Sequence, residues 1–184
     1  GPGPSLKKYR AKIKKFIKNS SLIVLCLNYN NILHKNYVNF YISCNFGRLM
    51  MELNDYIGTN KPLIFPKYLI SEKNLFLKKI NILNFGVKFE KNNFKIMKDK
   101  CILPENLSLF YALCVAIQSK PKNIFLAGID GYKKNDSNFT FVNKYIKIFK
   151  KYNFHKKITA LTPTNFSFKY NERIINESNI SHTS

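Results

Sequence analysis

The sequence predicts an α/β protein with a Rossmann-like, mostly parallel, doubly wound sheet and helices on both faces. Short apolar runs that suit buried strands alternate with segments of helical periodicity. Polar residues follow several of these runs directly, and open α/β sheets bind ligands at the carboxyl ends of their strands. The clearest instance is residues 123–132, where an apolar run ends in Gly128, Asp130 and Tyr132.

The first part of the chain is expected to contain two helices and three strands. A Gly/Pro-rich turn over residues 1–6 leads into a helix over 7–18, for which Ser5 is a suitable N-cap. The apolar runs indicate strands over residues 21–27, 38–43 and 63–65. Asn28 and Asn45 follow the first two of these strands, and a helix over 48–57 begins after Gly47.

The remainder of the chain continues the alternation. A helix is expected over 69–79, and peripheral strands or a hairpin over 80–97 with a turn at Asn92 and Asn93. The later helices and strands are expected over residues 107–119 (helix), 123–127 (central strand), 142–152 (helix with Val142, Tyr145, Ile146 and Phe149 inward) and 158–161 (strand ending at Thr162). We expect one domain over residues 1–170 and a polar tail over 171–184.

The amino-acid composition narrows the class of protein to which the chain can belong. The chain has 184 residues, of which 45% are hydrophobic, so a real core is expected and disorder throughout is excluded. No apolar run approaches the roughly 18 residues of a transmembrane helix, and no signal peptide is recognisable. The opening Gly1-Pro2 in place of a Met indicates a processed chain or a piece of a longer one. Four cysteines without paired spacing favour a reduced cytoplasmic protein over a disulfide scaffold or a metal site.

The net charge of +21 indicates attraction to anions. Only Arg10, Arg48 and Arg173 are arginines among the 31 basic residues, and the lysines are spread along the chain. Readers of bases and phosphates use the planar fork of arginine, so specific nucleic-acid binding is not expected. The remaining anions are a nucleotide, an acidic sugar or an anionic membrane surface, the last implying peripheral association at the inner face of the membrane.

In a parallel sheet the strand ends meet at one edge, near the opening loop. A Gly-rich turn that starts a helix offers N–H groups to a phosphate, although an ordinary turn and cap explains the same residues. Arg48 at a helix start is a candidate for binding a carboxylate or phosphate. We therefore expect a nucleotide-type ligand among Gly3, Pro4, Ser5, Asn28, Asn45, Gly128, Asp130 and Thr162.

The sequence motifs around these residues resemble those of the bacterial sialyltransferases that cap lipooligosaccharide. Those enzymes take sialic acid from a CMP-activated donor. The family's opening Gly-Asn-Gly-Pro-Ser-Leu loop is similar to residues 1–6, with Pro2 in place of Asn. Its strand-end asparagines match Asn28 and Asn45, its helix-start Ser matches Ser108, and its Ser-Gly-Ile-Asp-x-Tyr matches residues 127–132. The resemblance implies nucleotide contacts at Ser108 and Tyr132 and a CMP-type nucleotide sugar as substrate, with no further cofactor.

The chain also departs from that family. Glu105 stands where the family has an Arg, and Asn138 and Phe139 stand where it has a second tyrosine. The family's catalytic His has no counterpart between Tyr132 and Phe154, and His155 follows the next helix. Sialyl transfer needs a base, and Asp130, with Tyr132, is the candidate left at the strand end, although an Asp there commonly anchors the turn.

A second resemblance covers residues 27–168 more closely. The chain is similar to the C-terminal domain fused to pyruvate-type aldolases in capsule and O-antigen clusters, which carries a Gly-x-Gly-Pro-Ser loop, Leu-Ala-Gly-x-Asp-Gly-Tyr and Leu-Thr-Pro-Thr. The motility-associated glycosylation family shares the Gly-Pro-Ser-Leu loop. All three imply surface-sugar biosynthesis, with an acidic sugar acceptor and a fused or associated aldolase domain as partners, and we also expect a homo-oligomer.

Three functions stay open at this point. The first is a glycosyltransferase-like domain that uses a CMP-activated acidic sugar. The second is a non-catalytic module that binds a nucleotide or sugar phosphate within a larger biosynthetic enzyme. The third is a basic nucleic-acid-binding or scaffold domain. Whether the chain is an enzyme is left open, since no His occupies the family's catalytic position.

Overall fold

The computed structural model describes residues 1–71, 74–151 and 157–177. The chain divides into two compact units: unit 1 combines Gly1–Leu22 with the segment from Pro121 onward, and unit 2 is Ile23–Lys120. Helices and mainly parallel sheets make up both units, so the predicted α/β class is confirmed. The Rossmann-like arrangement and the single domain over residues 1–170 stay predictions, because two compact units can belong to one domain or to two.

Unit 2 is built on a four-stranded parallel sheet with the order β1-β2-β3-β4. Its strands are β1 (Leu25–Leu27), β2 (Phe40–Ile42), β3 (Leu63–Phe65) and β4 (Ile82–Asn84). Parallel neighbours need crossover connections. These contain the 3₁₀ helix η1 (Lys35–Tyr37), the helices α3 (Phe46–Met51) and α4 (Leu53–Thr59), and the 3₁₀ helices η2 (Lys67–Leu69) and η3 (Leu75–Lys79).

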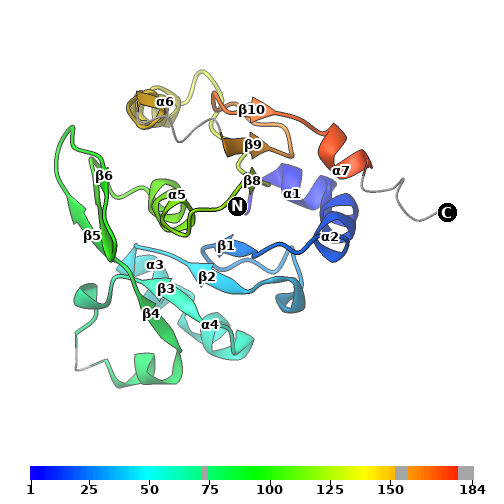
Figure 1. Ribbon diagram of the computed structural model, residues 1–184. Helices are drawn as coiled ribbons and strands as arrows, with labels where there is room; N and C mark the ends of the chain where they lie inside the picture. The colour runs from blue at the N-terminus through cyan, green and yellow to red at the C-terminus, as the bar shows by residue number, and fades with distance from the viewer. Residues whose placement is uncertain (72–73, 152–156, 178–184) are drawn as a thin grey trace. The chain divides into compact units, whose positions relative to one another are not determined.

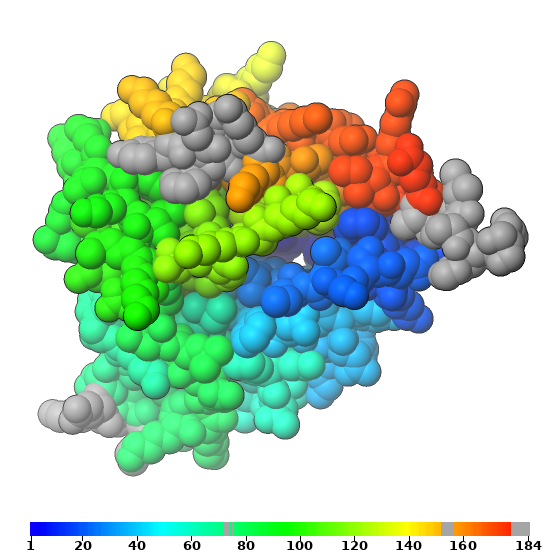
Figure 2. Space-filling view, viewed as in Figure 1, coloured from blue at the N-terminus to red at the C-terminus, as the bar shows by residue number. Residues whose placement is uncertain are grey.

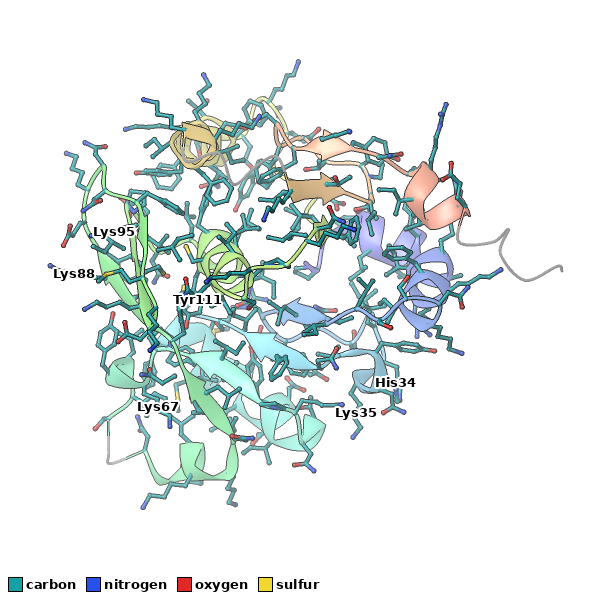
Figure 3. All side chains as sticks on the ribbon, viewed as in Figure 1. His34, Lys35, Lys67, Lys88, Lys95 and Tyr111 are labelled. Atoms are coloured by element: carbon teal, nitrogen blue, oxygen red, sulfur yellow. The ribbon has the colours of Figure 1, made fainter. Side chains whose placement is uncertain are left out.

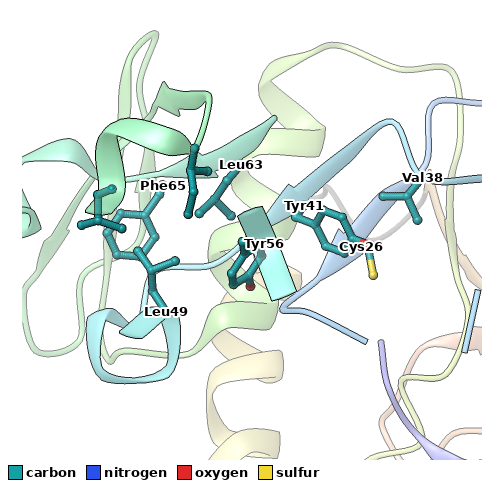
Figure 4. Packing of buried hydrophobic residues seen from close by; sticks show 9 residues of the cluster. Cys26, Val38, Tyr41, Leu49, Tyr56, Leu63 and Phe65 are labelled. Atoms are coloured by element: carbon teal, nitrogen blue, oxygen red, sulfur yellow. The ribbon is translucent and has the colours of Figure 1, made fainter. Parts of the chain in front are cut away.

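Alternate residues of a strand point to opposite faces of its sheet. In this sheet both sets include buried apolar side chains, so both faces are apolar. Tyr41, Leu63 and Phe65 pack with Leu49 of α3 and Tyr56 of α4 in one cluster of buried side chains (Figure 4). The intervening strand residues, such as Ile42 and Ile64, are buried as well. Figure 1 shows α4 and α5 (Ser108–Gln118) on opposite sides of the sheet, and α5 contacts β1.

A smaller sheet in unit 2 has the order β5-β7-β6. Its strands are β5 (Gly86–Phe89), β6 (Lys95–Ile96) and β7 (Lys100–Leu103). β5 pairs with β7 in parallel, and β6 pairs with β7 antiparallel. The predicted turn is confirmed at Asn92, whose φ is +62°. A hairpin between 80–85 and 87–97 is not found, because β4 pairs with β3 in the larger sheet.

Unit 1 joins the beginning of the chain to its end. Its described elements are α1 (Pro4–Lys8), α2 (Arg10–Lys18), β8 (Ile124–Leu126), α6 (Ser137–Lys151), β9 (Ile158–Ala160), β10 (Lys169–Tyr170) and α7 (Arg173–Glu177). The sheet β10-β9-β8 is parallel. Blue atoms of the first helices and red atoms of α7 lie side by side in Figure 2. In addition, Lys12 of α2 forms an ion pair with Glu172 at 2.9 Å.

The core of unit 1 follows the helical periodicity of its sequence. Val142, Tyr145, Ile146 and Phe149 of α6 are buried, as predicted. Phe16 of α2 packs edge to face on Phe125 of β8, with 5.5 Å between ring centroids. α6 thus forms the crossover between the parallel strands β8 and β9.

The structure corrects two predicted helices and the buried face of a third. Residues 69–79, where the sequence predicts one helix, contain 3₁₀ helices instead over their described part. The helix over 48–57 is broken at Glu52 into α3 and α4. α5 confirms the predicted helix over 107–119, and its buried residues are Phe110, Tyr111, Leu113 and Cys114. The helical spacing of the sequence predicts a face of Leu109, Leu113, Ala116 and Ile117, of which Leu113 alone is buried.

The tail predicted from residue 171 begins with a packed helix. Ile175 of α7 is buried, and α7 contacts α2. Residues 178–184 lie outside the described residues, as does His155.

Candidate functional site

In unit 1 the opening loop is hydrogen-bonded to the end of β8. The Gly1 nitrogen donates to the Ala127 carbonyl at 2.6 Å, and the Gly3 amide donates to the Gly128 carbonyl at 2.9 Å. A Cβ on Gly3 would lie 2.7 Å from that carbonyl oxygen and 2.5 Å from Asp130 Oδ1. The loop therefore needs glycine because the two backbone segments approach so closely.

Asp130 holds the first turn of α1. The amide of Ser5 donates to Asp130 Oδ2 at 2.7 Å, and the hydroxyl of Ser5 donates to Asp130 Oδ1. A helix start offers unpaired N–H groups and a positive dipole end, and a carboxylate is a suitable partner for both. The Asp130 carboxylate therefore occupies the donors of Ser5, and the Gly128 carbonyl occupies the amide of Gly3, which the sequence assigned to a ligand phosphate.

Thr162 completes this group, which we call the Asp130 cluster (Ser5, Gly128, Asp130 and Thr162). Thr162 is buried, and its hydroxyl accepts from the Gly128 amide at 2.9 Å. Because the Ser5 hydroxyl proton is directed to Asp130, the Thr162 hydroxyl donates to Ser5 Oγ, at 2.9 Å. Gly128 has a φ of +66°, which favours glycine. The predicted ligand residues of unit 1 are thus brought together and bonded to one another.

Tyr132 lies outside this network. Its side chain is 39% exposed, and its ring contacts Phe166 edge to face at 6.3 Å between centroids. Gly131, with a φ of +77°, separates it from Asp130. The phenol hydroxyl has no hydrogen-bond partner among residues 1–71, 74–151 and 157–177, and solvent reaches it.

In unit 2 the predicted asparagines stand at the ends of neighbouring strands. Asn28 follows β1 in the left-handed conformation, with a φ of +53°, and is 6% exposed. The buried Ser43 hydroxyl, after β2, donates to Asn28 Oδ1 at 2.9 Å and accepts from the Asn45 amide at 3.4 Å. Ser43 therefore links the two predicted asparagines at the carboxyl edge of β1 and β2.

Asn45 has a local role as well. Its side chain accepts from the Arg48 amide at 3.0 Å and so caps α3. Arg48, predicted to bind ligand, directs its Nε to Glu52 Oε1 at 2.7 Å. Glu52 Oε2 also accepts from the Tyr29 amide at 3.1 Å and the Tyr56 hydroxyl at 3.2 Å. These tertiary bonds fix Glu52, whose ψ of 12° separates α3 from α4.

Cys44 connects the strand ends to α5. Its thiol donates to Asn106 Oδ1 at 3.2 Å and contacts Ser108 Oγ at 3.8 Å. Burial raises the pKa of this thiol to about 12, so it stays a neutral donor. Asn28, Ser43, Cys44, Asn45 and Ser108 form what we call the strand-end cluster.

The start of α5 lies in this cluster. Its N-cap, Leu107, provides no side-chain bond, and no acidic residue stands in the first turn. Ser108 is half-buried. The helix start therefore offers N–H groups next to polar side chains, with no carboxylate in its own first turn.

Sequence reasoning missed Ser43, Cys44 and Asn106. Ser43 is a polar residue at the end of an apolar strand, the same signal that identified Asn28. Cys44 and Asn106 carry no such signal, because the contact between them joins segments 62 residues apart.

Two searches of the described residues concern metals and membranes. They found no group of three or more His, Cys, Asp or Glu that could hold a metal ion, and no described helix has the length and hydropathy needed to cross a bilayer. Comparison with known proteins gave no match: no family model, no curated protein and no solved structure matches this chain.

Proposed function

We propose that this chain is a glycosyltransferase-like domain that binds a nucleotide-activated, CMP-type acidic sugar for surface polysaccharide synthesis. The nucleotide binds at the strand-end cluster of unit 2. Parallel α/β sheets carry ligands at this edge, which is also the basis for proposing a Rossmann-like fold. The motifs that resemble lipooligosaccharide sialyltransferases supply the choice of nucleotide.

Asn28 is the observation that carries the proposal. Ser43 fixes its Oδ1, so the Nδ2 amide is oriented, and within the described residues no protein atom accepts from Nδ2. This oriented amide is not among the buried atoms that lack a partner, so solvent reaches it and it is free to donate to a ligand. A phosphate oxygen or a base carbonyl is a suitable acceptor, and the start of α5 favours an anion.

The second candidate is a non-catalytic nucleotide- or sugar-phosphate-binding module, and Asp130 favours it. Both carboxylate oxygens of Asp130 accept hydrogen bonds from Ser5. A base must be free to take the acceptor proton, so Asp130 would have to exchange a partner before acting. Of the two residues predicted to be catalytic, Asp130 and Tyr132, the exposed Tyr132 is therefore the remaining candidate.

The wider setting is part of the proposal. The lysine-rich composition supports a cytoplasmic protein at the inner face of the membrane, held by anionic lipids. An aldolase domain, fused or associated, an acidic acceptor sugar and a second copy of the chain are the proposed partners. Specific nucleic-acid binding is not proposed, because the chain has only three arginines.

Thermal unfolding with nucleotides tests the binding. A ligand that binds only the folded state stabilises it by about 2.7 kcal/mol at 100 times its Kd, so CMP should raise the Tm and UMP should raise it less. Absence of any shift with cytidine and uridine nucleotides would overturn both candidates.

Turnover separates the two candidates. With a CMP-sugar, release of CMP that is lost in Tyr132→Phe supports the enzyme. Tight binding without release supports the module. The control is Tyr170→Phe, because Tyr170 is an exposed tyrosine of unit 1 outside both clusters.

A further inference from the structure

Unit 2 contains a cavity of about 330 Å³ that the proposed nucleotide site does not use. It lies among the loop after β1, η1 and α4, and its lining includes Tyr29, Asn30, His34, Tyr41, Asp55 and Thr59. Its volume is at the small end of the range for ligand pockets, about 300 to 1,000 Å³. Such a volume suits one ring-sized ligand.

One wall of the cavity is aromatic and rigid. Tyr29 and Tyr41 lie 5.8 Å apart between ring centroids, and Tyr56 packs edge to face on both. The Tyr29 backbone is held by Glu52. Sugar rings pack their C–H faces on aromatic side chains fixed in this way.

Asn30 supplies an unsatisfied polar group. Its Nδ2 donates to Cys26 Sγ at 3.0 Å, and its Oδ1 is buried with no hydrogen-bond partner among the described residues. If the amide is turned over, its nitrogen becomes the unpaired atom instead. In either orientation one buried polar atom of a cavity-lining side chain lacks a partner among the described residues. When the Asn30 side chain turns toward the cavity, a ligand hydroxyl can satisfy this atom as donor or acceptor.

The lining carries one carboxylate, Asp55, and one ammonium, Lys35, and these opposite charges favour a neutral ligand. The Asp55 carboxylate makes no ion pair or hydrogen bond within the described part of the chain. Burial is the main cause that raises the pKa of Tyr29, and the negative charge of Asp55 is the next. The carboxylate therefore lies close enough to influence the phenol. The Lys35 ammonium donates to the Gly58 carbonyl at 3.2 Å, and Figure 3 shows it beside His34.

We propose that this cavity binds one neutral pyranose unit of a glycan, with Tyr29 against the ring and its hydroxyls on Asp55 and Asn30. Asp55 disfavours an acidic sugar, in contrast to the acidic acceptor expected from the resemblance. Asn28 of the proposed nucleotide site and Tyr29 of the cavity are consecutive residues, and the two sites share no lining residue. The role of the bound sugar as a glycosyl acceptor rests on the proposed function. The binding of the sugar to the cavity does not.

Saturation-transfer NMR with galactose, glucose, N-acetylglucosamine and sialic acid tests the site on the full chain. We expect transfer from the protein to ring protons of at least one neutral sugar. Asp55→Asn and Asn30→Leu should each weaken binding about tenfold, the effect of one lost hydrogen bond. Asn30→Leu also removes the unpaired buried group, so the variant should remain folded.

The control is Asp99→Asn, which changes an exposed carboxylate of unit 2 outside the cavity. It should leave sugar binding unchanged. No transfer to any neutral sugar, preference for sialic acid, or transfer that persists in both cavity variants would overturn the proposal. Sugar binding without a CMP-induced shift in Tm would overturn the proposed function alone, and the reverse would overturn the cavity proposal alone.

Discussion

The Asp130 cluster of unit 1 and the strand-end cluster of unit 2 were predicted from the same kind of signal, polar residues directly after an apolar strand. Their structures differ. In the Asp130 cluster the carboxylate, the two hydroxyls and the Gly128 amide bond one another. In the strand-end cluster the Asn28 Nδ2 has no acceptor among the described residues. Closed hydrogen bonding indicates an anchor, and an oriented donor that no protein group accepts from indicates a ligand site.

The largest effect is expected from Asp130→Ala. The substitution removes an anion that two donors of Ser5 bind, and hydrogen bonds to charged groups contribute about 1.5 to 3 kcal/mol each. We expect the free energy of unfolding to fall by about 3 kcal/mol in urea. Asp99→Ala, the exposed counterpart, should change it little. A fall of similar size in both variants would contradict the anchoring role of Asp130.

Gly128→Ala should come next. The new Cβ would lie 2.6 Å from Leu6 Cβ, at a φ of +66°. We expect a loss of about 2 kcal/mol in the same unfolding measurement. Gly58→Ala is the matched control, because no atom lies within 4 Å of a Cβ there and α4 should gain about 0.5 to 1 kcal/mol. Loss at Gly58 or no change at Gly128 would contradict this account.

Asn28→Gly should change affinity more than stability. Glycine keeps the left-handed backbone, and the lost amide should weaken CMP binding about tenfold in calorimetry. Asn60 has the same φ of +53° at the C-cap of α4, so Asn60→Gly is the control and should bind CMP like the unaltered chain. Equal affinities in both variants would remove Asn28 from the site.

The smallest effect concerns the buried thiol of Cys44. Its folded pKa of about 12 exceeds the ordinary value of 9.0, so its contribution is complete below pH 9 and is lost as the pH rises toward 12. At about pH 10 the expected loss of unfolding free energy is about 1 kcal/mol. Cys44→Ala should show a smaller alkaline loss in urea midpoints. An equal loss would assign the pH dependence to other groups.

The fold was predictable where local and tertiary preferences agree. β3 matches its predicted bounds, since Leu63–Phe65 is an apolar run that Pro66 terminates, and α6 buries its predicted stripe. The break at Glu52 was not predictable, because Glu favours helices and its partner Tyr29 lies 23 residues away. β7 was missed, although its apolar residues 101–103 also stand directly before a proline, Pro104.

The polar residues of the candidate sites could be predicted from the sequence, but their hydrogen bonding could not. Strand-end polarity identified Asn28, Asn45, Asp130 and Thr162. It could not distinguish a ligand residue from an anchor, because the Asp130 bond to Ser5 joins residues 125 positions apart. That distinction depends on which polar atoms are left without partners once the chain has folded.

The most direct test of the central claim is a CMP titration followed by two-dimensional ¹H–¹⁵N NMR. The account predicts saturable shifts of the Asn28 side-chain amide and of the backbone amide of Ser108, with smaller changes at Ser5 and Gly128. Shifts that begin at Ser5 and Gly128 while Asn28 stays unchanged would contradict it.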